Sequence, residues 1–182
     1  TEDIALNLSR FVDAIMARVF KHETILELAK HATVPVINGL CDLHHPCQGL
    51  ADLLTVWEKK RGFEGLTLTF VGDGNNVAHS LIEGCAKVGM AFRIACPKGY
   101  EPDAEIVAAA RALGASIEIL HDPLAAARGA DVLYTDVWVS MGKEVESQRR
   151  LADLAGYQLN ASVVGLAKPG ALVMHCLPAY RG

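Results

Sequence analysis

The sequence predicts an α/β fold in which a parallel sheet is flanked by helices. From residue 66 onward, short apolar segments alternate with segments whose apolar residues recur at helical spacing. Glycine, proline and aspartate mark many of the joins between them. Apolar residues make up 51% of the 182 residues and charged residues 21%, which is the composition of a globular chain with one good core.

Composition and charge exclude several classes of partner. The net charge is −4 with both signs mixed, so no basic surface for nucleic acid is expected. No apolar run approaches the roughly 18–20 residues that span a membrane, and no signal peptide is expected. The five cysteines are odd in number and contain no C-x-x-C pair. Reduced thiols in a cytosol-like compartment are therefore expected.

The first third of the chain predicts two helices and a strand. A helix is expected over residues 4–19, because apolar residues recur there every three or four positions. A shorter helix follows over residues 23–30. The segment Val34-Pro-Val-Ile-Asn-Gly39 predicts a short buried strand with Pro35 near its start.

A third helix is expected to begin at Pro46, because proline is well tolerated at the first helical position. His45 is then the N-cap or its neighbour, and the helix ends near residues 61–62. His45 and Gln48 are three residues apart and share a face at the positive end of this helix. Such side chains beside free backbone N–H groups suit a carbonyl oxygen or a phosphate. One apolar stripe of this helix contains Leu50, Leu53, Leu54 and Trp57.

The rest of the chain alternates regularly between the two kinds of element. Strands are expected over residues 66–71, 91–95, 116–120, 132–135 and 171–175. Helices are expected over residues 77–88, 103–113, 123–127, 143–155 and 161–167, with Gly114 ending the second of these. The alternation implies right-handed crossovers and a parallel sheet covered on both faces. We expect one domain over residues 1–62 and a second over residues 63–182, with the third helix reaching the boundary.

Ligands of such sheets bind beyond the carboxyl ends of the strands. The segments that follow the predicted strands are rich in polar side chains. This topology places five residues on one rim, and they are Asn75, Asn76, Asp136, Ser140 and Cys176.

Most familiar chemistries fit the sequence poorly. Gly72-x-Gly74 lacks the third glycine of a dinucleotide motif, and no acidic residue follows the strand at 91–95. The histidines show no metal-ligand spacing with cysteine. Cys176 and its neighbour His175 point to opposite faces if both lie in a strand, so a direct dyad is not expected. Neither a cofactor nor a metal is expected, and the remaining chemistry is to hold two reactive substrates together.

Four segments in combination resemble ornithine carbamoyltransferases, within the aspartate/ornithine carbamoyltransferase family. They occur in the order of that family and at approximately its spacing, and the resemblance covers nearly the whole chain. The segments are His45-Pro-Cys-Gln48, Gly72-Asp-Gly-Asn-Asn76, Asp136-Val-Trp-Val-Ser-Met-Gly142 and His175-Cys-Leu-Pro-Ala-Tyr-Arg-Gly182.

The resemblance implies a reaction and roles for site residues. The substrates are carbamoyl phosphate and L-ornithine, whose δ-amine attacks directly to give citrulline and phosphate. The residues matching His45 and Gln48 contact the carbamoyl group, and Cys176 matches a residue near the reacting carbon. The residues that match substrate-binding positions are Asn76, Asp136, Ser140, Met141 and Leu177.

The resemblance also implies a cytoplasmic or organellar homotrimer, or a higher homo-oligomer, without nucleic-acid or membrane partners. Asp3-Ile-Ala-Leu6 stands where the family has D-T-A-R, so Leu6 replaces an arginine expected to contact carbamoyl phosphate. The phosphate-gripping motif and the closing helix of the family have no counterpart here. We therefore expect an incomplete piece of a carbamoyltransferase that is inactive alone.

Three alternatives remain at this point. An aspartate carbamoyltransferase shares the fold and the His-Pro-x-Gln signal but lacks the Ser-Met-Gly and His-Cys-Leu-Pro segments. A non-catalytic paralogue that binds an amino acid is favoured by Leu6. An NAD-dependent enzyme is disfavoured by the missing acidic residue. Titration calorimetry separates the last two. Heat from the binding of ornithine in the absence of carbamoyl phosphate indicates the paralogue, and heat from the binding of NADH indicates the NAD-dependent enzyme.

Overall fold

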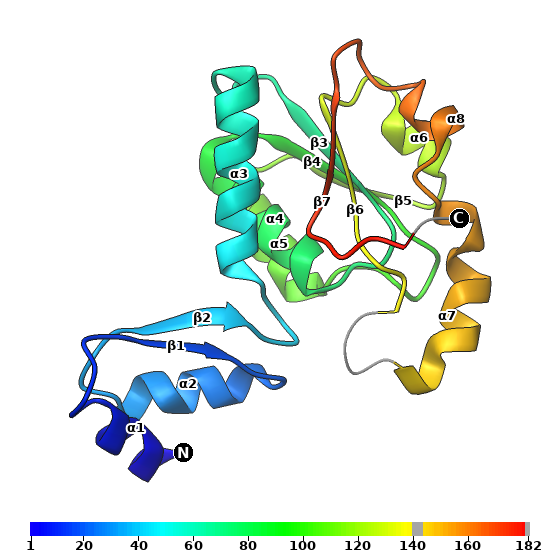
Figure 1. Ribbon diagram of the computed structural model, residues 1–182. Coiled ribbons are helices and arrows are strands. Elements are labelled where there is room, and N and C mark those ends of the chain that lie inside the picture. The colour runs from blue at the N-terminus through cyan, green and yellow to red at the C-terminus, as the bar shows by residue number, and fades with distance from the viewer. Residues whose placement is uncertain (140–143, 181–182) are drawn as a thin grey trace.

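The computed structural model describes residues 1–139 and 144–180 and arranges them in two lobes, each built on a parallel sheet (Figure 1). In the smaller lobe β1 and β2 pair in parallel, and α2 makes the crossover between them. A long helix, α3 (Pro46–Lys60), leads from this lobe into the larger one. The elements of the smaller lobe are α1 (Glu2–Leu8), β1 (Ile15–Arg18), α2 (His22–His31) and β2 (Val36–Leu40).

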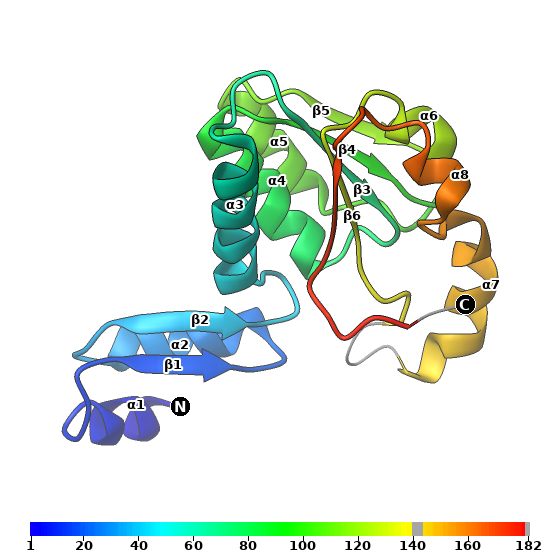
Figure 2. The same cartoon turned by 45° about the horizontal axis from the view of Figure 1, so that its top comes forward.

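The larger lobe contains a parallel sheet whose described strands have the order β5-β4-β3-β6-β7. Helices α3, α4 and α5 cover one face, and α6 and α8 cover the other (Figure 2). The predicted fold class is therefore confirmed. The elements after α3 are β3 (Thr67–Val71), α4 (Asn76–Val88), β4 (Ala91–Ala95), α5 (Ala104–Ala112), β5 (Ile117–Leu120), α6 (Pro123–Ala127), β6 (Val132–Thr135), η1 (Glu144–Glu146), α7 (Ser147–Leu154), η2 (Ala155–Tyr157), α8 (Ala161–Val164) and β7 (Leu172–His175).

The order of the strands creates a switch point beside β3. The chain passes from β3 to β4 and β5 on one side, and then returns to β6 on the other side of β3. The crossovers from β3 and from β6 therefore leave the sheet in opposite directions. A crevice opens between such strands at their carboxyl ends, which is where open α/β sheets bind ligands.

The core follows the alternation of side chains along the central strand. Leu68 and Phe70 point toward α4 and its neighbours, and the ring of Phe70 stacks on that of Tyr134 with 5.6 Å between centroids. Val71 points the other way and joins Leu133 beneath α6 and α8. Both faces of β3 are covered, and its one fully buried polar side chain, Thr69, donates its hydroxyl to the carbonyl of Ala126 over 3.1 Å.

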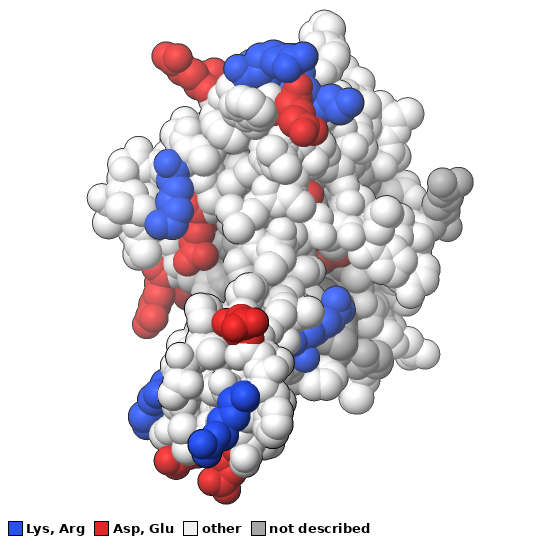
Figure 3. Space-filling view, turned by 60° about the vertical axis from the view of Figure 1, so that its left-hand side comes forward, with Lys and Arg blue, Asp and Glu red and all other residues white. Residues whose placement is uncertain are grey.

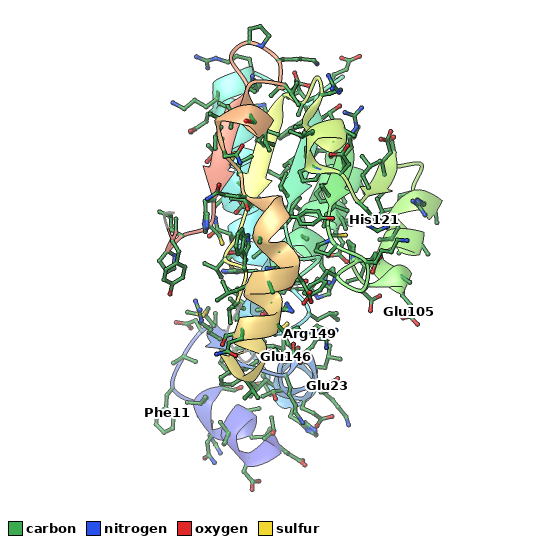
Figure 4. The ribbon with its side chains drawn as sticks, turned by 90° about the vertical axis from the view of Figure 1, so that its right-hand side faces the viewer. Phe11, Glu23, Glu105, His121, Glu146 and Arg149 are labelled. Carbon is green, nitrogen blue, oxygen red and sulfur yellow. The ribbon has the colours of Figure 1, made fainter. Side chains whose placement is uncertain are left out.

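The helix predicted over residues 4–19 is wrong. Helix α1 ends at Leu8, and residues 15–18 form β1. Phe11, one of the apolar residues within the predicted helix, is 83% exposed and points away from the lobe (Figure 4). Parallel pairing with β2 satisfies the backbone of β1, and this long-range partner outweighs the local helical spacing.

Three smaller expectations also need correction. Leu40 is the only residue of β2 that is fully buried, so this is not a buried strand. Helix α8 is shorter than the predicted 161–167. On α3 the predicted apolar stripe is not the buried face of the helix, because Leu50, Leu54 and Trp57 are exposed.

The buried face of α3 contains Leu53 and Val56 and packs against α4. The two helices approach closely because Gly84 has no side chain, and a Cβ there would lie 2.8 Å from Cδ1 of Leu53. Shape, rather than the number of apolar residues, therefore decides which face of α3 is buried.

The surface shows no dominant charge on the face drawn in Figure 3, where acidic and basic side chains are interspersed. Among the described residues, no helix combines the length and the apolar character needed to cross a membrane.

Gly74→Ala should destabilise the fold strongly. The N–H of Gly74 donates to the carbonyl of Tyr100 over 2.8 Å, and a Cβ at position 74 would lie 2.6 Å from the carbonyl carbon of Glu101 and close to the nitrogen of Pro102. We expect a loss of about 1–3 kcal/mol or more in urea unfolding, because backbone cannot move aside as a flexible side chain can.

Gly156→Ala is the matched control for this change. A Cβ at position 156 would have no atom within 4 Å, so the loss should stay within about 0.5 kcal/mol. Equal unfolding midpoints for the two variants would contradict the close packing of the loops after β3 and β4.

Candidate active site

One pocket of about 550 Å³ lies where the carboxyl ends of the strands of both lobes meet. Its size is typical of small-molecule sites, which measure about 300–1,000 Å³. The smaller lobe contributes residues that end or follow β1 and β2, and the larger lobe contributes the loops after β3, β4, β6 and β7. The lining residues that carry the argument below are Arg18, Cys41, His45, Asp73, Asn75, Asn76, Tyr100, Asp136, Arg150, Cys176 and Leu177.

Asp136 is held at the switch point by Asn75. Oδ1 of Asn75 accepts from the N–H groups of Val77 and Ala78 at 3.0 and 3.1 Å, which makes Asn75 the N-cap of α4. Its Nδ2 is thereby aimed across the crevice and donates to Oδ2 of Asp136 over 2.7 Å. A single amide therefore joins the loop after β3 to the loop after β6.

Cys176 binds the other oxygen of the same carboxylate. Its Sγ–H donates to Oδ1 of Asp136 over 2.9 Å. Burial, followed by the negative charge of Asp136, raises the pKa of the Cys176 thiol. The thiol is therefore protonated at neutral pH and is a poor nucleophile.

The ring of His175 does not activate Cys176. Nδ1 of His175 accepts instead from the N–H of Leu177 over 2.8 Å. A ring nitrogen of His175 lies within 4.8 Å of the Cys176 sulfur, but the thiol donates to Asp136 and Nδ1 of His175 accepts from Leu177, which agrees with the prediction that they form no direct dyad. The strand β7 ends at His175, and Leu177 has a φ of 59°, so strand alternation no longer applies there.

His45 occupies the N-cap position of α3, as predicted, with Pro46 following it in the first turn. Its backbone N–H donates to Oγ of Ser80 over 2.8 Å. Burial, followed by the positive charge of Arg18, lowers the pKa of His45 below the usual 6.5. Its Nδ1 is buried without a hydrogen-bond partner among the described residues. A neutral imidazole with an unused ring nitrogen is suited to a hydrogen bond with a ligand.

Gln48 does not line the pocket, although it lies one turn along α3 from His45. Its Nε2 donates to Oδ1 of Asp52 over 3.0 Å, and the hydroxyl of Tyr134 donates to Oδ2 of Asp52 over 2.8 Å. Asp52 is only 4% exposed, and its burial raises its pKa despite these two bonds. The amide of Gln48 is therefore anchored to the core of the larger lobe.

The remaining predicted residues divide into two groups. Asn76 lines the pocket, and its Nδ2 donates to the carbonyl of Cys41 over 2.7 Å, which joins the two lobes. Leu177 also lines the pocket. Ser140 and Met141, together with Gly142, lie outside the described residues.

Two arginines of the pocket were missed by sequence reasoning. Arg18 ends β1 and makes no ion pair with any residue that the structure describes. The incorrect helix over residues 4–19 concealed this position at a strand end. Leu6, by contrast, is 44% exposed on α1 and does not line the pocket.

Arg150 is 6% exposed and connects α7 to the crevice. It forms an ion pair with Asp73, its Nε donates to the carbonyl of Trp138 over 3.3 Å, and its guanidinium lies 5.0 Å from the ring centre of Tyr100. The hydroxyl of Tyr100 donates in turn to Asp153 over 2.8 Å. No local sequence pattern marks Arg150, because its partners are up to 77 residues away.

Comparison with known proteins assigns the two lobes to two domain types. Residues 64–182 match the domain described as "Aspartate/ornithine carbamoyltransferase, Asp/Orn binding domain". Residues 1–58 match the domain described as "Aspartate/ornithine carbamoyltransferase, carbamoyl-P binding domain". The chain belongs to the aspartate/ornithine carbamoyltransferase family. The resemblance read from the four sequence segments is confirmed.

Similar proteins of this family are named for ornithine. The chain is 54% identical over 181 residues to the ornithine carbamoyltransferase of Methanosarcina acetivorans, which covers all of this chain and 60% of that protein. It is 53% identical over 184 residues to a protein of Pyrococcus furiosus named "Ornithine carbamoyltransferase, anabolic", covering 99% of this chain and 58% of that protein. The chain thus spans about 60% of the length of these relatives.

Solved structures of the family superpose closely on this chain. The ornithine carbamoyltransferase of Pyrococcus furiosus gives a TM-score of 0.94 at 52% identity, covering 100% of this chain and 59% of that one. The enzyme of Gloeobacter violaceus gives 0.92 at 48% identity, covering 100% of this chain and 62% of that one.

Asp52→Asn should stabilise the protein relative to the natural chain as pH rises. The pKa of Asp52 is raised above the usual 3.8, so the folded state keeps this proton to higher pH than the unfolded state does. Its contribution to stability is complete below the unfolded pKa and falls as pH rises through the folded pKa. Urea unfolding from pH 4 to pH 7 should show that the difference in free energy of unfolding between Asp52→Asn and the natural chain grows with pH and then becomes constant.

Asp13→Asn is the control, because Asp13 is exposed and the variant should follow the natural chain throughout. A difference for Asp52→Asn that is the same at every pH would show that the buried carboxylate does not titrate differently in the folded state.

Proposed function

We propose that the complete protein transfers the carbamoyl group of carbamoyl phosphate to the δ-amine of L-ornithine, giving L-citrulline and phosphate. The observation that carries this proposal is the pocket of about 550 Å³ that residues of both lobes line. One lobe matches a carbamoyl-phosphate-binding domain and the other an aspartate- or ornithine-binding domain. The printed names of the similar proteins favour ornithine over aspartate as the acceptor.

The larger lobe supplies the proposed ornithine site. Asp136 offers a carboxylate to the α-ammonium group of ornithine, and its position is fixed by Asn75 and Cys176. Asn76 holds the α-carboxylate end, and Leu177 lies beside the reacting δ-amine. Ser140 and Met141, which follow β6 in the sequence, are proposed to contact the same amino acid.

The junction between the lobes supplies the proposed carbamoyl-phosphate site. A neutral His45 donates a hydrogen bond to the carbamoyl oxygen, where negative charge develops as the amine attacks. The resemblance assigns a carbamoyl contact to Gln48 as well, but its side chain does not line the pocket and its Nε2 binds Asp52, so this contact requires the amide to turn from its present position. The guanidinium of Arg18 suits the phosphate, because it carries a permanent charge and several donors in one plane.

The chemistry needs no covalent intermediate. The δ-amine forms the new C–N bond, the C–O bond to phosphate breaks, and the amine gives up a proton. Cys176 remains a protonated thiol beside the reacting atoms. Holding both substrates in reacting geometry is worth about 7–11 kcal/mol at best.

We further propose that residues 1–62 and 63–182 are the two domains, and that the complete protein is a cytoplasmic homotrimer or higher homo-oligomer. We place the reaction in arginine biosynthesis. The name "Ornithine carbamoyltransferase, anabolic" printed for the relative from Pyrococcus furiosus supports that placement.

Asp136→Asn in the complete protein should mainly weaken the use of ornithine. Losing one charged hydrogen bond costs about 1.5–3 kcal/mol, so kcat/KM for ornithine should fall roughly 10- to 100-fold, mostly through KM. Citrulline formation at saturating carbamoyl phosphate measures this. Asp13→Asn serves as the control on the surface of the smaller lobe, and unchanged ornithine kinetics in Asp136→Asn would refute the assigned role.

His45→Gln should lower turnover more than it lowers ornithine affinity. The hydrogen bond to the carbamoyl oxygen strengthens in the transition state, and the loss of one such donor lowers kcat about 10²- to 10³-fold. Steady-state kinetics with both substrates varied separates the two effects. A raised KM with an unchanged kcat would contradict this role, because His45 would then bind the ground state and the transition state equally.

A further inference from the structure

A cluster of side chains that could bind a metal ion lies beside the pocket, at the connection between the lobes. It consists of His22, Cys41 and His44, and one potential ligand atom of each lies within 4.8 Å of those of the other two. His22 begins α2, and the other two residues belong to the segment that joins β2 to α3. Figure 1 shows the start of α2 next to this connection.

The distances within the cluster resemble those that a tetrahedral ion imposes on its ligands. Nδ1 of His22 lies 3.3 Å from Sγ of Cys41. Zinc holds sulfur at about 2.3 Å and imidazole nitrogen at about 2.0–2.1 Å, which puts such ligands roughly 3.5 Å apart in a tetrahedron. The ring centroids of His22 and His44 are 5.4 Å apart with the ring planes at 65°, so the two imidazoles lie next to each other beside the sulfur. Cys41 and His44 also have the C-x-x-H spacing, which the sequence analysis overlooked.

The surroundings of the cluster match those of bound thiolates and imidazoles. The sulfur of Cys41 is buried and accepts from Nδ2 of Asn38 and from the N–H of His44, both at 3.3 Å. Such donors stabilise a negative sulfur. Nε2 of His44 lies 3.4 Å from a carboxylate oxygen of Glu83, and it is buried without a well-formed hydrogen bond in the described chain. A carboxylate behind a ligating histidine fixes its orientation.

We propose that His22, Cys41 and His44 form a binding site for a thiophilic divalent cation of the Zn²⁺ class. One thiolate and two imidazoles form a nitrogen and sulfur donor set that selects such ions over Mg²⁺ or Ca²⁺. Binding releases the proton of the Cys41 thiol and leaves a fourth position for water. The ion joins α2 to the segment before α3. It thereby makes the segment that ends at His45 more rigid.

A second cluster must be separated from this one. Asp136, His175 and Cys176 also lie within 4.8 Å of one another, but they belong to the proposed ornithine site. The test therefore uses the full chain in a Cys176→Ser background, so that only the cluster of His22 remains intact.

Co²⁺ is the probe, because its bonds to thiolate give a charge-transfer absorption that its bonds to imidazole or carboxylate do not. Cys176→Ser should bind one equivalent of Co²⁺ with this absorption, and Zn²⁺ should displace it. Adding Cys41→Ser should abolish the absorption, whereas adding Cys47→Ser, which removes an exposed thiol instead, should leave it unchanged. Absence of the absorption in Cys176→Ser, or its persistence after Cys41→Ser, would overturn the proposal.

His22→Gln provides an independent variant if the loss of the buried Cys41 impairs folding. His22 is partly exposed, and its backbone N–H donates to Asp42 whatever its side chain. In the Cys176→Ser background, His22→Gln should weaken Zn²⁺ binding by more than about 100-fold, since even partners behind the ligands contribute 10- to 100-fold. Unchanged Zn²⁺ affinity would exclude His22 as a ligand and contradict the site.

Discussion

The site depends on the hydrogen bond between Asn75 and Asp136. Asn75 caps α4 with its oxygen and holds Asp136 with its nitrogen, so the start of a helix fixes a carboxylate on the far side of the crevice. The thiol of Cys176 donates to the same group, which closes the crevice from β7. These three loops lie at the point where the order of the strands reverses, which is where an open parallel sheet leaves room for a ligand.

The second lobe completes the pocket with the opposite charge. The carboxyl ends of β1 and β2 face the same space, and Arg18 lies at the end of β1. Several contacts cross the junction. Asn76 donates to the carbonyl of Cys41, the backbone N–H of His45 donates to Ser80, and the ring of His79 lies 2.9 Å from the carbonyl of Leu43. The lobes are thus connected at the pocket itself, and any ligand or ion bound there also stabilises their relative position.

The larger lobe could be predicted almost completely from the sequence, because each of its strands and helices is encoded locally. The turn at Gly72–Asn76, the cap at His45 and the helix at residues 123–127 all follow from short-range rules. The smaller lobe could not, since Ile15–Arg18 becomes a strand only when it pairs with β2. Dependence on distant partners also limited the prediction of the site. Residues at strand ends, such as Asp136 and Cys176, were found from topology, whereas Arg18 and Arg150 depend on distant partners. The His22 cluster likewise joins segments about 20 residues apart.

The most direct test of the shared pocket is a crystal structure of the complete protein with an analogue of both substrates. A phosphonate linked through an acetyl group to the δ-nitrogen of ornithine reproduces the two reactants in one molecule. The account predicts that its carbonyl oxygen lies within hydrogen-bond distance of His45 while its α-ammonium group contacts Asp136. An analogue bound away from the crevice beside β3, or in contact with only one of these two residues, would contradict it.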